Sequence, residues 1–125
     1  MERTIKRFYK DMKKTRKYCP WAKEQSLKNF LDELKSEIEE AKIAIKNNDE
    51  ENLKEELGDI FCDTLFLMII ANEEGYDIRE IIKNANKKQR RRKPFVFKTP
   101  PKKVTLDEAR KIWKDAKQKE KEDKK

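Results

Sequence analysis

The sequence contains no histidine and only two cysteines, Cys19 and Cys62, which are not spaced as Cys-x-x-Cys. Protein zinc sites are built mainly from cysteine and histidine, so a zinc site of the usual kind is nearly excluded. A di-iron helical bundle is also disfavoured, because its Glu-x-x-His motif is missing. We therefore expect any metal site in this chain to use oxygen ligands.

Glycine and proline are also scarce, with two and four residues in a chain of 125. So few turn-forming residues leave little room for hairpins, and the apolar pattern follows a helical period. The longest apolar run, residues 60–71, contains Asp63 and is shorter than the roughly 20 residues that span a bilayer. The N-terminal residues 1–17 are too charged for a secretory signal. We expect an all-α, cytoplasmic protein without a membrane partner.

Charged residues make up 46% of the chain, and the net charge is +8. This charge favours polyanionic partners, which are nucleotides, nucleic acid or an acidic membrane surface. Apolar residues make up 35%, enough for one modest helical core. We expect a single domain over residues 1–117, followed by a charged, fraying tail over residues 118–125.

Five helices are predicted from apolar periodicity, capping boxes and helix breakers. The first two cover about residues 2–17 and 26–46, and Cys19-Pro20 separates them. The other three begin at capping-box pairs, which are Asn48/Glu51, Asp77/Glu80 and Thr105/Glu108. An irregular stretch is expected after Pro94.

The helix that begins near Asn48 is apolar nearly all round from Leu57 to Ala71. Such a helix should be buried on several sides. A monomer of this length can hardly surround it. We therefore expect a bundle of four to five helices that homo-oligomerisation completes, as a dimer or a tetramer.

Acidic pairs spaced Asp/Glu-x-x-Asp/Glu occur five times, so the spacing alone is a weak signal. Position sets two of them apart. Glu37 and Glu40 lie beside the apolar stripe of the second predicted helix, whereas Glu56 and Asp59 share a narrow sector of the third. A short loop makes these two helices antiparallel neighbours. Four or five carboxylates can therefore converge across one interface.

Asp63 falls in the same sector as Glu56 and Asp59, inside the apolar run. A buried carboxylate without a partner is costly, so it needs a cation, a metal or a neighbour. Ligands that are all oxygen suit Mg²⁺ or Mn²⁺, and Mg²⁺ typically brings phosphates with it. The alternative is a set of Lys–Glu pairs that use Lys35, Lys42 or Lys54.

Cations at i, i+4 spacing suggest where an anion could bind. Lys88 and Arg92 share one helical face, and Trp113 and Lys117 share another. The cations suit a phosphate, and the ring of Trp113 suits stacking on a base. Two alternatives stay open: Trp113 packs its helix onto the core, and residues 87–93 form a basic patch that binds nucleic acid or nothing.

Several motifs together resemble the MazG-like family of nucleoside triphosphate pyrophosphohydrolases. The pair Glu37-x-x-Glu40 and Glu56-Leu57-Gly58-Asp59 is similar to the metal-binding motifs of that family. The other matching motifs are Cys19-Pro20-Trp21, Lys23-Glu24-Gln25-Ser26, Glu73-Glu74-Gly75, Asn86-x-Lys88, Arg91-Arg92-x-Pro94-x-Val96-Phe97 and Trp113-x-x-x-Lys117. The resemblance covers nearly the whole chain.

The resemblance implies Mg²⁺-dependent hydrolysis of an NTP or dNTP to the monophosphate and pyrophosphate, typical of nucleotide-pool house-cleaning, with Mn²⁺ as a substitute. It implies that Glu37, Glu40, Glu56 and Asp59 hold the metal and that catalysis depends on Glu37 and Glu56. It also implies substrate contacts from Lys88, Arg92, Trp113 and Lys117. A base-specific relative, such as a dUTP or dCTP hydrolase or a phosphoribosyl-ATP pyrophosphohydrolase, is a further alternative. So is a non-catalytic basic helical module that binds nucleic acid.

The sequence departs from the family pattern at a few positions. Ser36 stands where the family usually has a first acid, which alters the arrangement that activates water. Asp63 is a candidate to compensate for it in part. Ala22 replaces a common Asp, and Lys93 and Phe95 replace the usual histidines around Pro94.

Overall fold

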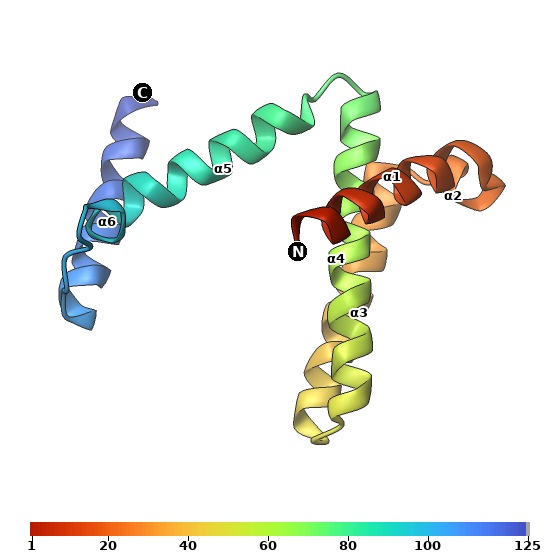
Figure 1. The fold of residues 1–125 in the computed structure, drawn as a ribbon, viewed down its shortest axis with the longest axis horizontal. Helices are drawn as coiled ribbons and strands as arrows, with labels where there is room; N and C mark the ends of the chain where they lie inside the picture. Colours follow the sequence, from red (N-terminus) through yellow and green to blue (C-terminus); the bar gives the residue numbers. More distant parts are fainter. Residues whose placement is uncertain (125) are drawn as a thin grey trace. The chain divides into compact units, whose positions relative to one another are not determined.

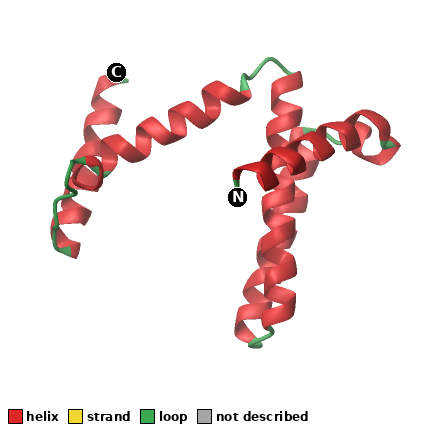
Figure 2. Cartoon of the chain, in the orientation of Figure 1, coloured by secondary structure: helices red, strands yellow, loops and turns green. Residues whose placement is uncertain are grey.

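The computed structural model describes residues 1–124, which form six α-helices and one 3₁₀ helix, with no strand among them (Figure 2). In chain order these are α1 (Glu2–Tyr18), α2 (Pro20–Glu24), α3 (Leu27–Lys46), α4 (Glu50–Glu73), α5 (Ile78–Arg92), η1 (Pro94–Phe97) and α6 (Leu106–Asp123) (Figure 1). The predicted all-α class is confirmed. Among the helices of residues 1–124, none has an apolar stretch that could span a lipid bilayer.

The chain folds as two compact units, the first from Met1 to Ile78 and the second starting at Arg79. In the first unit, α3 and α4 form an antiparallel hairpin, against which α1 packs through α4 (Figure 1). Aromatic rings pack against each other at the open end of the hairpin, where α3 begins. The ring centroids of Phe30 and Phe66 lie 4.7 Å apart there. The buried core around them comprises Ala22, Phe30, Phe66 and Ile70.

Arg16 ties three segments of the first unit together. Its guanidinium donates to the backbone carbonyls of Ala22 and Gln25 and forms an ion pair with Glu73 at 2.8 Å. Only 14% of its side chain is exposed, so this charge is largely removed from water and depends on these acceptors. The contacts fix α1 and α2 against the C-terminal end of α4.

Helix boundaries agree with the capping signals at some positions and differ at others. At α6 both halves of the capping box are present, with Thr105 and Glu108 each bonding the backbone of the other. Helix α4 starts one residue later than expected, because Asp49 is the N-cap and Asn48 adopts a left-handed φ of 53° in the turn. The short helix α2 after Cys19 was not predicted; Pro20 occupies its first turn, where a missing N–H costs nothing.

The C-terminal end of the chain also differs from the prediction. Residues 118–123 continue α6 as regular helix, and Glu120 forms ion pairs with arginines of α5. The fraying tail expected from Gln118 is therefore wrong for these residues. No apolar residue follows Ala116, so the sequence pattern predicts a helix end there, whereas in the structure the helix continues and Glu120 pairs with the arginines of α5.

Candidate functional site

Three carboxylates meet across the α3–α4 hairpin. Glu37 comes from α3, Glu56 and Asp59 come from α4, and one oxygen of each lies within 4.8 Å of the others. Glu56 is buried, with 6% of its surface exposed. The convergence expected from helical spacing is thus observed for these three residues. Glu40, one turn along α3 from Glu37, joins them electrostatically, since the charge of Glu56 raises the pKa of Glu40.

Buried oxygens without a partner mark this cluster as chemically unsatisfied. Among the described residues, Glu37 Oε2, Glu56 Oε2 and Asp63 Oδ2 are buried and accept no hydrogen bond. Leaving such an atom unpaired costs about 1–3 kcal/mol, and more when the group is charged. Oxygen donors gathered at this spacing suit a hard divalent cation such as Mg²⁺. The residues present therefore fit a divalent cation.

The pKa values of the cluster show the same repulsion. A hydrogen bond shared with Glu37, burial and the charge of Glu37 all raise the pKa of Glu56. For Glu37 that shared hydrogen bond acts to lower the pKa, but burial and the charges of Glu40, Asp59 and Asp63 outweigh it and the pKa is raised. The two carboxyl groups thus share one proton more readily than they both ionise.

Asp63 and Glu33 extend the acidic surface beyond the four expected acids. Burial, followed by the charges of Glu33 and Asp59, raises the pKa of Asp63 to about 6. Glu33 was not predicted as part of the site. The signal that could have found it is its position one helical turn before Glu37, on the same side of α3.

Lys–Glu pairs do form in this part of the chain, but not with the carboxylates of the cluster. Lys42 pairs with Glu39 at 3.5 Å, and Lys54 pairs with Glu51 at 3.3 Å. No ion pair formed within residues 1–124 involves the carboxylates of Glu37, Glu56 or Asp59. Protein cations therefore leave the cluster uncompensated.

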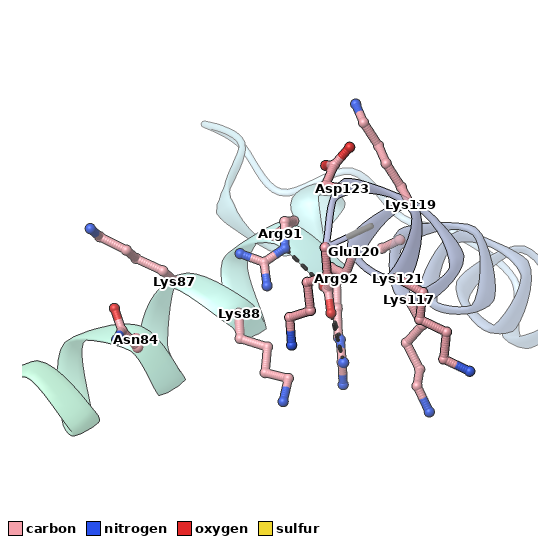
Figure 3. Close-up of a pocket in the computed structure, with 12 residues that line it drawn as sticks. Asn84, Lys87, Lys88, Arg91, Arg92, Lys117, Lys119, Glu120, Lys121 and Asp123 are labelled. Atoms are coloured by element: carbon pink, nitrogen blue, oxygen red, sulfur yellow. Dashed lines mark hydrogen bonds and ion pairs between the residues drawn. The ribbon is translucent and has the colours of Figure 1, made fainter.

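A second feature lies between α5 and α6, in the second unit. Here Lys88, Arg92 and Lys117 line one cavity of about 940 Å³. Figure 3 shows these three side chains extending to the same side, whereas Lys87 and Lys119 extend away from it. The i, i+4 spacing pairs Lys88 with Arg92 and Trp113 with Lys117, and the structure brings three of these four residues to one cavity.

Trp113, the fourth residue, supports two of the cations. The guanidinium carbon of Arg92 lies 5.8 Å from the centroid of the indole, and Nζ of Lys117 lies 4.4 Å from it. Cation–π contacts of this kind hold a positive charge over an aromatic face. Packing of α6 by Trp113 and a role beside the cations are thus compatible.

Glu120 is the residue of this region that the sequence did not reveal. Its carboxylate accepts from Arg91 Nε at 2.8 Å and from Arg92 Nη2 and Nε at 2.9 and 3.3 Å. These hydrogen bonds, Arg92 first, lower the pKa of Glu120 to about 2. Its spacing from Trp113 and Lys117 (i+7 and i+3) places it on their face, a signal that the expected tail concealed.

The family model described as the MazG nucleotide pyrophosphohydrolase domain matches residues 25–97. A solved structure of a mazG-related protein from Thermotoga maritima superposes with a TM-score of 0.83 and 38% identity, over 90% of this chain and 98% of that one. The two share the fold and are related in sequence.

Two curated relatives carry enzyme names. The nucleoside triphosphate pyrophosphohydrolase/pyrophosphatase MazG of Thermotoga maritima is 34% identical over 86% of this chain and 40% of its own length. The nucleoside triphosphate pyrophosphohydrolase of Escherichia coli K12 is 36% identical over 63% of this chain and 30% of its own length. The chain therefore spans less than half the length of these relatives.

Proposed function

Since this chain belongs to the MazG nucleotide pyrophosphohydrolase family, we propose that it hydrolyses a nucleoside or deoxynucleoside triphosphate to the monophosphate and pyrophosphate. The observation that carries this proposal is the cluster of Glu37, Glu56 and Asp59, whose oxygens lie within 4.8 Å of one another. Two of these residues bury an oxygen that has no hydrogen-bond partner within residues 1–124. Such a cluster is unfavourable unless a cation joins it.

Glu37, Glu40, Glu56 and Asp59 would hold Mg²⁺, with Mn²⁺ as a substitute. When bound, the cation would polarise phosphate oxygens and make a water more acidic. Catalysis would depend most on Glu37 and Glu56, which face each other from the two helices. Asp63, buried one turn beyond Asp59, is the additional acid of this site.

The cations of the α5–α6 cavity would bind the phosphates. Lys88, Arg92 and Lys117 carry three positive charges to one cavity, which suits an anion of high charge. Such fixed charges stabilise the negative charge that develops on a pyrophosphate leaving group. Trp113 would contribute through the cations that it supports and through contact with the nucleotide.

The cellular role that fits this reaction is house-cleaning of the nucleotide pool in the cytoplasm. A homo-oligomer is part of the proposal, because α3 and α4 keep large apolar side chains that the first unit does not cover. These side chains are Leu31, Ile38, Ile43, Ile45, Leu57 and Phe61.

Product analysis with a panel of substrates tests the proposal. The protein is incubated with each NTP and dNTP, with Mg²⁺ and with EDTA, and pyrophosphate and orthophosphate are measured separately. We expect pyrophosphate and the monophosphate, only with the metal, and a preference that identifies the base. Release of orthophosphate, or turnover that is equal in EDTA, would refute the proposed reaction. A protein that hydrolyses no member of the panel would refute it as well.

A further inference from the structure

The carboxylate of Glu120 connects α6 to both arginines at the end of α5. It accepts from Arg91 through one oxygen and from Arg92 through both (Figure 3). The side chains of Arg92 and Glu120 are only 14% and 17% exposed, whereas that of Arg91 is 50% exposed. The Arg92–Glu120 pair is therefore the part of this contact that is shielded from water, where such a pair keeps a defined geometry.

The contact uses one particular edge of the Arg92 guanidinium. Both of its donors to Glu120 lie on the edge formed by Nε and Nη2. A guanidinium carries five N–H donors in a rigid planar fork, so fixing this edge also fixes the direction of the Nη1 donors. Trp113 restricts the same group from its face, at 5.8 Å. The guanidinium of Arg92 is thus held along one edge by Glu120 and on one face by the ring of Trp113.

The fixed guanidinium lies at the cavity that Lys88 and Lys117 also line. Without a nearby anion, these cations would repel one another and a long arginine side chain would turn towards water. Glu120 supplies that anion and is ionised throughout the physiological range, because its pKa is about 2. The cavity of about 940 Å³ remains beside it, so an incoming phosphate has room without displacing the carboxylate.

We propose that Glu120 is a positioning residue for anion binding: it orients Arg92 so that the unused donors of the guanidinium act with Lys88 and Lys117 on a polyphosphate. The inference rests on the proposed function for its ligand class. It assigns Glu120 an effect opposite to that expected of a negative charge beside an anion site. A carboxylate that acted only through its negative charge would weaken phosphate binding. A carboxylate that positions Arg92 strengthens phosphate binding.

Binding of inorganic tripolyphosphate to the full chain, measured by calorimetry in metal-free buffer, tests this assignment. Glu120→Gln should weaken binding about tenfold, comparable to the loss of one well-placed interaction. The matched control is Glu122→Gln, on the same helix, whose exposed carboxylate bonds only Gln118 among the described residues. We expect the control to bind within about twofold of wild type.

A double-mutant cycle separates positioning from a general effect on the fold. In an Arg92→Ala background, Glu120→Gln should weaken binding no further, because the residue through which it acts is gone. Equal losses in both backgrounds would overturn the assignment, and so would unchanged or tighter binding by Glu120→Gln in the wild-type background. If Glu120→Gln does not fold, Glu120→Asp replaces it, since this variant keeps the charge and withdraws it by one methylene. Weaker binding at an unchanged melting temperature then supports positioning, and wild-type binding overturns it.

Failure of the inference and failure of the proposed function give different results. If the double-mutant cycle shows coupling between Glu120 and Arg92 but the protein hydrolyses no nucleotide, the anion site is supported and the proposed enzyme activity is refuted. Normal hydrolysis with the same kcat/KM in wild type and Glu120→Gln would keep the enzyme and reject the positioning role.

Discussion

Glu37 of α3 and Glu56 of α4 face each other across the helical hairpin, and each keeps a buried oxygen with no hydrogen-bond partner in residues 1–124. Two carboxylates at this separation cannot both ionise at little cost. A shared proton or a bound cation resolves the conflict, and the cation also satisfies the free oxygens. The relationship therefore makes distinct predictions for the protein with and without metal.

Replacing one of the two carboxylates should remove activity without removing the fold. Glu56→Gln keeps the shape of the side chain but loses its charge, so we expect Mg²⁺-dependent turnover to fall by more than about 100-fold, because even outer-shell partners of a metal are worth 10–100-fold. The circular dichroism spectrum should remain helical. Glu55→Gln, on the neighbouring exposed position, is the control and should retain activity. Turnover by Glu56→Gln at the wild-type rate would falsify this site.

Stability in the absence of metal should depend on pH through Asp63. Burial and nearby charge raise the pKa of Asp63 from 3.8 to about 6, so the folded state holds a proton that the unfolded state releases between these values. Its contribution to stability is therefore complete below about pH 4 and is lost as the pH rises through about 6. Urea unfolding in EDTA from pH 4 to 7.5 should show that Asp63→Asn gains stability relative to wild type as the pH rises. A constant difference between the two proteins over this range would contradict the assignment.

Helical periodicity was sufficient to predict that three of the acids meet, because two antiparallel helices with a short loop leave few possible registers. Glu37, Glu56 and Asp59 were placed together on that basis. Glu33 was not predicted, although it lies one turn before Glu37 on the same side of α3, because its own side chain is exposed and its charge acts on Asp63 of the neighbouring helix. Sequence spacing defines faces within one helix, but it does not define which side chain of a neighbouring helix comes within range.

In the second unit, too, sequence spacing predicts the faces of each helix but not the contacts between helices. The faces of Lys88/Arg92 and Trp113/Lys117 follow from their i, i+4 spacing, whereas the contact of Arg92 with the ring of Trp113 joins residues on different helices. Glu120 was assigned to a tail because the residues after Ala116 are polar and charged, as a solvated helix end also would be. Pairing with two arginines distinguishes these cases, and that pairing depends on how α6 lies against α5.

An oligomer should form through the apolar faces that the first unit leaves open. Leu31, Ile38 and Ile45 follow one another at seven-residue intervals along α3 and are 55%, 41% and 61% exposed. Fully burying an exposed side chain of this kind contributes about 1.5–3 kcal/mol, and covering the roughly half of each side chain that is still exposed contributes about half as much, so the three together favour association. Light scattering at micromolar concentration should give a dimer or tetramer, and Ile45→Lys should shift it towards the monomer. Ile82→Lys, an exposed position on α5, is the control. A stable, well-folded wild-type monomer would count decisively against this expectation.

The basic residues of the second unit should serve a triphosphate and not nucleic acid. Arg92 and Trp113 are in contact, and Arg92 lines the cavity with Lys88, so cations gathered for a small ligand should act locally. We expect Arg92→Ala and Trp113→Ala each to lower kcat/KM for the preferred nucleotide by about 10²–10³, as is typical when a group that stabilises developing charge is removed. Lys103→Ala, a cation outside the cavity lining, is the control and should keep the wild-type value within about twofold.

The same preparations distinguish the enzyme from a basic nucleic-acid-binding module. Affinity of such a module falls steeply with salt, in proportion to the number of phosphates contacted, and a single alanine changes it little. Duplex and single-stranded DNA and RNA are therefore titrated with wild type, Arg92→Ala and Trp113→Ala at two salt concentrations. Loss of hydrolysis in both variants, with only weak and salt-sensitive nucleic-acid binding in all three proteins, is the expected result. Tight binding of any of these nucleic acids at physiological salt, with no nucleotide hydrolysed by the wild type, would instead make the charge of +8 the functional feature of the chain.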